Sequence, residues 1–321
     1  MSIERTEASP TDVTPGDVQP GDVKPGDVKP AGERTGRGLD AAPGYRPGRT
    51  LSVWTEMVRQ AARRRTQWSL AFMVLLPLII LAAFQLNTDD DDRERNSGFG
   101  QLVELATSGG SNFALFCLFV SAGFLLVVVV ALFCGDTTAR EASWGSLRYL
   151  LAIPVPRSRL LGVKLVVALM YSALAIVLLV GTALLAGTLR YGWHPLQAPI
   201  GGELSAGQGL LRLLAVVGYI AIGLLVVGSL AFLLSVSTDA PLGAVGGAVL
   251  LQIMSNILDQ ITALGDLRNL LPTHFSTAWL GLLSNPVQTD DLVRGCVSAL
   301  AYATIFLALA WWRFLRKDVV S

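Results

Sequence analysis

Residues 164–189 read KLVVALMYSALAIVLLVGTALLAGTL, an apolar run in which only the opening Lys164 is charged. An α-helix rises 1.5 Å per residue, and the hydrocarbon core of a bilayer is about 30 Å thick, so about 20 apolar residues cross it. This stretch exceeds that length. It therefore predicts a transmembrane helix.

Five further apolar runs of similar character flank this one. They are Trp68–Leu86, Phe113–Phe133, Leu211–Val236, Leu242–Ala263 and Leu292–Trp312. Polar residues, including Gln252 and Asp259, interrupt the second half of the fifth run in chain order, so we expect its outer end to face protein or water rather than lipid. The pattern predicts an all-α membrane protein with six transmembrane helices.

The composition agrees with a membrane protein. Hydrophobic residues make up 52% of the 321-residue chain and charged residues 15%, against about 25% charged in an average soluble domain. The net charge of +1 provides no field that would attract nucleic acid. Three cysteines are too few for a disulfide framework. A soluble enzyme, a nucleic-acid-binding protein and a secreted disulfide-rich module are therefore excluded.

The chain divides near residue 50. Residues 1–50 are rich in Pro, Gly and Asp, and from Pro15 they repeat as PGDVQ, PGDVK and PGDVK. Such a period breaks helices and strands and offers too little apolar surface for a core. We expect a disordered tail over 1–50, either merely solvated or used as a docking arm, and a transmembrane domain over 51–321.

The stretch Leu51–Trp68 has an amphipathic pattern. Leu51, Trp54 and Val58 recur at spacings of three and four, while Glu56 and Arg59 fall mostly elsewhere. This pattern, with Trp at both ends, predicts an N-terminal helix that lies at the membrane interface.

The distribution of positive charge predicts the orientation. With six spans and the amino terminus inside, the inner flanks hold 12 Lys and Arg residues and the outer side holds 6. Positively charged loops stay in the cytoplasm. We expect both termini in the cytoplasm and the protein in the plasma membrane.

The outer segment between the last two runs is long and partly apolar. Leucines and aromatic residues, among them Leu267, Phe275 and Trp279, recur at helical spacing around Pro272. This pattern predicts two short re-entrant helices that dip into the outer interface without spanning it. His194 and His274 are single histidines without cysteine partners, so we expect no metal site.

The inner loop Gly135–Lys164 carries a second amphipathic pattern. Trp144, Leu147 and Leu151 form an apolar stripe, and Glu141, Gly145 and Arg148 form a polar one before Pro154. The pattern alone fits equally a helix that rests on lipid headgroups and one that is offered to a cytoplasmic partner.

The string EASWGSLRYLLAIPVPRSRLLGVK, residues 141–164, resembles the inner-loop signature of permeases of type-2 ABC exporters. That signature has a Glu, then Gly-Thr-Leu, a leucine pair, Pro-Val/Ile-Ser-Arg and a Lys that opens the third span. The matching residues are Glu141, Gly145, Leu147, Leu150, Leu151, Pro154, Arg157 and Lys164, with Ser146 and Pro156 in place of the usual Thr and Ser. The resemblance covers about residues 51–321.

The resemblance implies that the inner-loop helix is a coupling helix that docks on a separate ABC ATPase subunit. The coupling residues would be Glu141, Trp144, Gly145, Leu147, Arg148 and Arg157, with Glu141 and Arg148 facing charges on the partner. It also implies a second permease subunit, identical or different, and contact with membrane lipid. ATP and Mg would be bound by the partner and no cofactor by this chain, which lacks a G-x-x-x-x-G-K-[ST] phosphate loop. The chain itself would not be an enzyme.

The alternative is an ion-coupled secondary transporter, or another multi-pass carrier without an ATPase partner. Such proteins hold ion sites near the middle of the bilayer. None of the six runs has an acidic residue at its centre, which favours the exporter permease.

Overall fold

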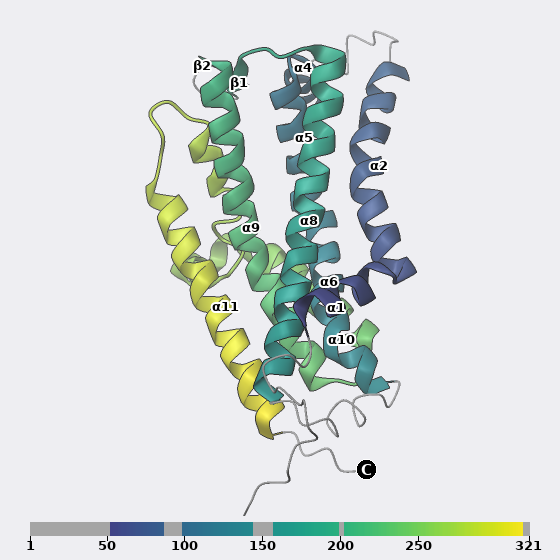
Figure 1. Ribbon diagram of the computed structural model, residues 1–321. Coiled ribbons are helices and arrows are strands. Elements are labelled where there is room, and N and C mark those ends of the chain that lie inside the picture. Colours follow the sequence, from purple (N-terminus) through teal and green to yellow (C-terminus); the bar gives the residue numbers. More distant parts are fainter. Residues whose placement is uncertain (1–51, 87–97, 144–156, 199–201, 317–321) are drawn as a thin grey trace, which may run out of the picture. The chain divides into compact units, whose positions relative to one another are not determined.

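The computed structural model describes residues 52–86, 98–143, 157–198 and 202–316. Its α-helices are α1 (Val53–Ala61), α2 (Arg64–Leu86), α4 (Gly98–Thr107), α5 (Gly110–Ala122), α6 (Leu125–Ser143), α8 (Arg157–Tyr191), α9 (Ala206–Ser237), α10 (Pro241–Asp259) and α11 (Asp290–Arg316). Two strands, β1 (Leu196–Ala198) and β2 (Gly202–Leu204), and two 3-10 helices, η1 (Thr262–Leu270) and η2 (Ala278–Leu282), complete this part of the chain (Figure 1). The expected tail over 1–50 lies outside the described residues.

Long apolar helices dominate the described part. Five of them, α2, α8, α9, α10 and α11, have the length and composition to cross a membrane, and the bent pair of α5 and α6 makes a sixth if it is counted as one span. The prediction of an all-α membrane protein is confirmed at this level, apart from one short strand pair.

The second predicted span is not one straight helix. The run Phe113–Phe133 is divided between α5 and α6, whose axes are bent by 59°. Just before the break, the Ser121 hydroxyl donates to the Cys117 carbonyl at 2.6 Å, a bond that competes with the helical pattern. Gly123 follows, with nothing within 4 Å of the position of a Cβ. The apolar composition predicted the span but not its break.

Helices α6 and α8 extend beyond their apolar runs. Helix α6 continues to Ser143 and α8 begins at Arg157, so both ends of the expected inner loop Gly135–Lys164 are helical. Charged residues of these two helices therefore lie on rigid backbone rather than in a loop.

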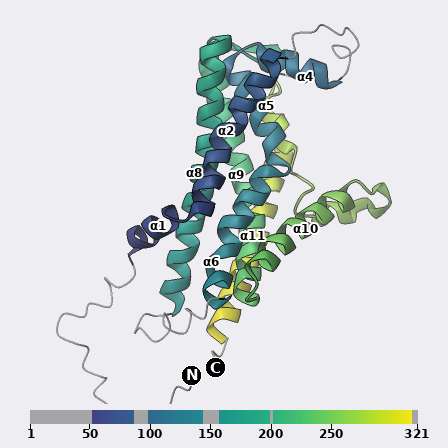
Figure 2. The same ribbon diagram turned by 90° about the vertical axis from the view of Figure 1, so that its right-hand side faces the viewer.

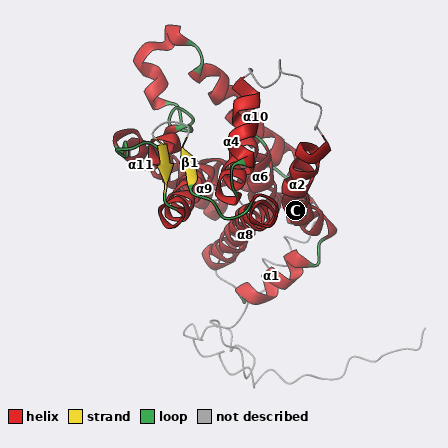
Figure 3. Cartoon of the chain, turned by 90° about the horizontal axis from the view of Figure 1, so that it is seen from above, coloured by secondary structure: helices red, strands yellow, loops and turns green. Residues whose placement is uncertain are grey.

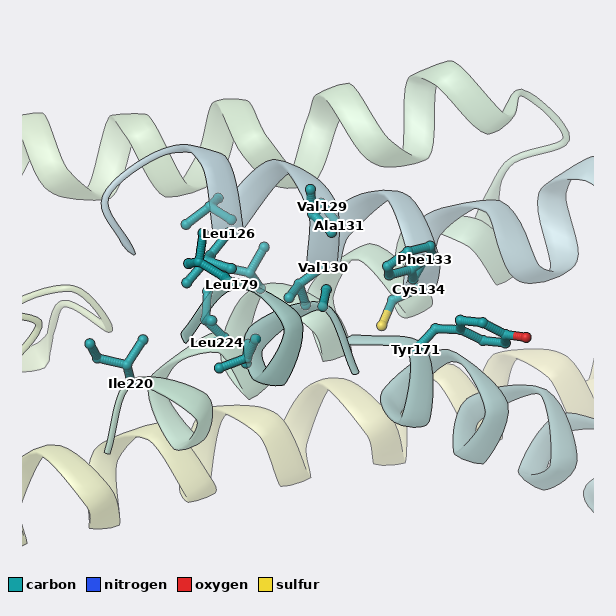
Figure 4. Packing of buried hydrophobic residues seen from close by; sticks show 14 of the residues in the cluster. Leu126, Val129, Val130, Ala131, Phe133, Cys134, Tyr171, Leu179, Ile220 and Leu224 are labelled. Atoms are coloured by element: carbon teal, nitrogen blue, oxygen red, sulfur yellow. The ribbon is translucent and has the colours of Figure 1, made fainter. Parts of the chain in front are cut away.

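The core lies between α5, α6, α8 and α9. Figure 4 shows Leu126 and Val130 of α6 packed with Leu179 of α8 and Leu224 of α9, all at most 6% exposed. Helices α5 and α8 approach closely at Gly110, where an added Cβ would lie 2.4 Å from the Thr188 side chain. Small residues permit such close packing of helices in lipid.

The helices have two distinct ends. At one, which we term the α1 end, α1 lies across the bundle beside α8, near the end of α6 and the beginning of α8 (Figures 2 and 3). At the other, which we term the hairpin end, β1 and β2 pair antiparallel. Asn112 of α5 fixes this hairpin by donating to the Gln197 carbonyl at 2.9 Å and accepting from the Gln197 amide at 3.1 Å. The sequence analysis did not predict these strands.

The α10–α11 connection, residues 260–289, contains the two short helices predicted around Pro272, as 3-10 helices η1 and η2. Helix α10 slopes away from the other helices before this connection (Figure 2). Tyr219 of α9 donates to the Phe275 carbonyl at 2.6 Å, and Tyr302 of α11 donates to the Leu270 carbonyl. Arg212 donates to the Leu282 and Ser284 carbonyls at 3.0 and 2.8 Å. The connection is thus fastened to both neighbouring helices through its backbone.

Candidate functional site

Helix α1 presents its polar face to the protein. Glu56 and Gln60 are buried, whereas Trp54 is 70% exposed and Val58 52% exposed. The Tyr171 hydroxyl of α8 donates to the Met57 carbonyl at 2.7 Å and fastens α1 in this orientation. The amphipathic helix was predicted. Its polar groups bond to other helices, whereas Trp54 and Val58 stay exposed on the opposite side.

The polar face of α1 joins a group of four charged residues, Glu56, Arg59, Glu141 and Lys164, which we term the charge cluster. Lys164 Nζ lies 2.6 Å from Glu141 Oε1, and Arg59 Nη2 lies 2.7 Å from the same oxygen. Arg59 Nη2 also lies 2.7 Å from Glu56 Oε2, and Lys164 Nζ lies 3.9 Å from Glu56 Oε1. Two cations and two carboxylates thus connect α1, α6 and α8.

Three of the four side chains are removed from solvent. The exposed fractions are 3% for Lys164, 7% for Glu141 and 8% for Glu56, against 45% for Arg59. Lys164 also donates to the Thr137 carbonyl at 3.3 Å. Buried charges persist only when partners compensate their lost hydration. The charges that α1, α6 and α8 contribute therefore compensate one another.

Arg59 is the exposed edge of the cluster. Burial acts to lower the pKa of its guanidinium, but the hydrogen bonds and negative charges of Glu56 and Glu141 outweigh burial and raise the pKa. Arg59 is therefore a permanent cation, and it faces the solvent-accessible side of the site.

A second group lies beside the cluster and involves Asp136 of α6. Arg140 Nη2 lies 2.9 Å from Asp136 Oδ2, and Arg65 Nη1 of α2 lies 3.4 Å from Asp136 Oδ1. On the other side of α6, the Ser235 hydroxyl oxygen of α9 accepts the backbone amides of Thr138 and Ala139, each at 3.0 Å. The last turns of α6 are thus tied to α1, α2, α8 and α9.

The predicted coupling residues are placed unevenly. Trp144, Gly145, Leu147 and Arg148 lie outside the described residues, and Arg157 is the first residue of α8. Glu141 lies in the last turn of α6, where its carboxylate accepts from Arg59 and pairs with Lys164. We expected Glu141 to face a partner; it is instead 7% exposed and bonded within the chain. The reason is that Lys164 and α1 fold back onto α6.

A further charged group lies between α10 and the α10–α11 connection. Asp259 Oδ1 is 2.6 Å from His274 Nδ1 and 3.6 Å from Arg268 Nε. Asp259 is 15% exposed and His274 24% exposed. From the sequence, we placed Asp259 against protein or water and treated His274 as a single histidine, and the structure brings the two together. Within the described ranges, no three His, Cys, Asp or Glu residues are grouped as a metal site would require.

A cavity of about 80 Å³ lies at the break between α5 and α6. Ala122 and Val127 line it from the two sides of the break, and Gln252 and Thr273 line it from α10 and the α10–α11 connection. Helix α6 therefore connects the charge cluster at one end with a partly polar cavity at the other.

The comparison with known families finds one whose description assigns no activity. The family described as Protein of unknown function (DUF2705) matches residues 75–320. The matched range includes Glu141, Lys164 and the α10–α11 connection, and it begins after α1. No curated protein matches the chain.

Proposed function

We propose that this chain, which belongs to the family described as Protein of unknown function (DUF2705), is the permease subunit of an ATP-driven exporter of the type-2 ABC kind. The observation that carries the proposal is the charge cluster. Glu141 precedes residues 144–156 in the chain and Lys164 follows them on α8, so the cluster joins the two helices that flank this stretch. This is the stretch whose sequence resembles a coupling helix.

The cluster would transmit a movement of that stretch to the membrane helices. A force on residues 144–156 acts on the end of α6 and the beginning of α8, which the Glu141–Lys164 pair holds at 2.6 Å. Arg59 adds α1, because it bonds Glu141 as well as Glu56. Since separating buried charges is costly, the three helices would move together.

At its other end, α6 would pass this movement to the cavity. The 59° break between α5 and α6 lies beside the cavity that Gln252 and Thr273 line. A displacement of α6 would change the angle at the break and the space between α9, α10 and the α10–α11 connection. We assign to this chain the opening and closing of this region during transport; the chain itself would catalyse no reaction.

The ATP would be hydrolysed on a separate ABC ATPase subunit, because this sequence contains no phosphate-binding loop. We propose that a second permease subunit, identical or different, completes the transmembrane pathway in the plasma membrane. Export as the direction of transport is what the resemblance implies.

The orientation that this function requires has a direct test. Ser158 is exposed at the start of α8, and Ser205 is exposed before α9, near the hairpin. In a background with Cys117, Cys134 and Cys296 replaced, Ser205→Cys should react with an impermeant maleimide on cells whose outer barrier is permeable. Ser158→Cys should react only after the plasma membrane is opened. Labelling of Ser158→Cys on closed cells would contradict a cytoplasmic α1 end.

The function itself is tested by purifying the tagged protein from its native membranes and measuring ATP hydrolysis and transport. We expect a soluble ATPase to co-purify, and Glu141→Gln to retain it while lowering transport per ATP about tenfold. The reason is that the neutral amide keeps the shape of Glu141 but loses the ion pairs that couple the helices. Absence of an ATPase partner would overturn the proposal.

A matched control separates coupling from stability. Gly187→Ala places a Cβ 2.9 Å from the Phe113 side chain, at the α5–α8 contact and away from the cluster. It should lower the amount of folded protein without changing transport per ATP. An equal loss of coupling in both variants would show that the effect of Glu141→Gln is only destabilisation.

One observation favours the second candidate function, an ion-coupled carrier. Asp259 and His274 form a 2.6 Å pair near the cavity-lining residue Thr273, and carboxylate and imidazole side chains are the kind that proton-coupled carriers use. In proteoliposomes without ATPase, such a carrier would transport in response to a proton gradient, and Asp259→Asn would abolish this activity. For the exporter permease, we expect gradient-driven transport to be absent and Asp259→Asn to retain ATP-driven transport.

A further inference from the structure

The connection between α1 and α2 gathers positive charge around a single carboxylate. Arg63 lies in the turn between the helices, and Arg65 lies in the first turn of α2. Arg65 and Arg140 both bond Asp136, at 3.4 and 2.9 Å. The backbone of Arg63 bonds to Gln60 and Gln67, but its guanidinium has no hydrogen bond or ion pair among the described residues. Three guanidinium groups thus surround one acidic group.

The environment of Arg63 makes this charge unfavourable without a further anion. Its side chain is half-buried. Burial, together with the positive charges of Arg140 and Arg59, lowers the pKa of Arg63. Because an arginine stays protonated in proteins, an incoming anion would relieve the repulsion. Asp136 and Glu56 act in the opposite direction on this pKa, but burial and the two neighbouring cations outweigh them.

Exposed apolar side chains flank the arginines. Trp54 and Val58 of α1 are 70% and 52% exposed, and Trp68 of α2 is 75% exposed. Tryptophan is enriched at membrane interfaces, where its ring reaches the acyl region and its N–H stays near the headgroups. With these tryptophans at the interface, Arg63 and Arg65, which lie between Val58 and Trp68 in the chain, would stand at the level of lipid phosphates.

We propose that Arg63, Arg65 and Arg140 form a binding site for the phosphate group of an anionic phospholipid. Guanidinium groups bind phosphate oxygens in a two-pronged geometry, and the site has a net charge of two after Asp136 is counted. The tryptophans would hold the acyl chains of the same lipid. The site is independent of the proposed transport function, because it requires no partner protein.

The test measures lipid binding to the delipidated full chain in detergent, by native mass spectrometry and by thermal stabilisation. Phosphatidylglycerol should bind roughly 25-fold more tightly than phosphatidylcholine, since each uncompensated cation near the headgroups contributes about a factor of five. Arg63→Gln should weaken phosphatidylglycerol about fivefold by the same reasoning and leave phosphatidylcholine unchanged.

Two variants sharpen the result. Arg64 has the same charge one residue away, is exposed and has no partner among the described residues, so Arg64→Gln should leave binding within twofold. Asp136→Asn should increase phosphatidylglycerol affinity, because it removes the competing carboxylate. If this variant does not fold, the comparison of Arg63→Gln with Arg64→Gln tests the proposal. Equal losses in Arg63→Gln and Arg64→Gln would show only general surface charge. Equal stabilisation by inorganic phosphate would show an ion site rather than a lipid site. Either result would overturn the proposal.

Discussion

At the α1 end, Glu141 and Lys164 are 7% and 3% exposed and lie 2.6 Å apart. The α10–α11 connection is held by two tyrosine hydroxyls and one arginine that donate to backbone carbonyls, and by the more exposed group around Asp259. Removing one member of a buried ion pair leaves a charge that nothing hydrates. Removing a tyrosine hydroxyl loses a hydrogen bond of ordinary strength. The α1 end is therefore built to keep three helices together, and the connection is built to be released at modest cost.

The largest effect should follow from breaking the charge cluster. Lys164→Met removes the cation shared by Glu141 and Glu56 and leaves two buried carboxylates with Arg59 as their cation. We expect a loss of stability of about 3–5 kcal/mol, measured as a lower unfolding midpoint in detergent and as reduced yield of folded protein.

The double variant Lys164→Met with Glu141→Gln is the control for this prediction. It removes the unpaired charge as well as its partner, and hydrophobic or neutral replacements of whole buried pairs are often tolerated. The double variant should therefore be more stable than Lys164→Met alone. If it is equally unstable, the cluster contributes packing rather than charge pairing, and the contrast with the connection fails.

The second effect concerns packing at the hairpin end, where charge is absent from the contact. Gly110→Val would place side-chain atoms against Thr188, whose backbone amide lies 2.7 Å from the Cβ position. Overpacking of this kind costs about 1–3 kcal/mol. Gly181→Val on the same helix as Thr188 meets nothing within 4 Å and should leave the unfolding midpoint nearly unchanged. Equal effects of the two variants would contradict the close α5–α8 approach.

The difference between the two regions also explains what the sequence could predict. The apolar runs predicted six spans, because length and composition are local properties. Five of these runs are helices long enough to cross a membrane, and the sixth is the pair of α5 and α6, whose 59° bend was not predicted. The charge cluster was not predicted, because Glu141 lies 82 residues from Arg59 in the chain. The amphipathic pattern of α1 gave a signal: Glu56 and Gln60 share a face four residues apart, and that face is buried. Which face of an interfacial helix contacts protein depends on the helices that pack against it, and the sequence does not identify those helices.

The sequence predicted the short helices of the α10–α11 connection but not the hydrogen bonds that hold the connection to α9 and α11. Leucine and aromatic spacing around Pro272 predicted two short helices, and η1 and η2 lie there. Tyr219 and Tyr302 hold the connection by donating to backbone carbonyls. Every residue has a backbone carbonyl, so the sequence does not indicate which one accepts the bond. For the same reason, Arg212 gave no signal as the residue that bonds two carbonyls near Ser284.

A third, smaller effect tests the releasable connection. Tyr219→Phe keeps the ring and removes the hydroxyl that donates to Phe275 at 2.6 Å. We expect a loss of about 1 kcal/mol, the usual net contribution of one hydrogen bond. Faster labelling of a cysteine introduced at the buried Thr273 should accompany it, because the connection would open more often. Labelling of this cysteine at the same rate with and without Tyr219→Phe would show that the hydroxyl does not restrain this segment.

The smallest effect should come from an ion pair outside the cluster, immediately after the connection. Arg294 Nη1 lies 3.8 Å from Asp291 Oδ1 in the first turns of α11, and both side chains are 70% exposed. Exposed pairs of this kind contribute about 0–1 kcal/mol, since water solvates each charge when the other is removed. Arg294→Gln should therefore shift the unfolding midpoint far less than Lys164→Met, although each removes one cation from an ion pair. The two variants, measured side by side, separate burial from charge as the source of stability at the α1 end. A shift in Arg294→Gln as large as that of Lys164→Met would mean that the loss of charge alone is sufficient, and burial of the cluster would then no longer explain its role.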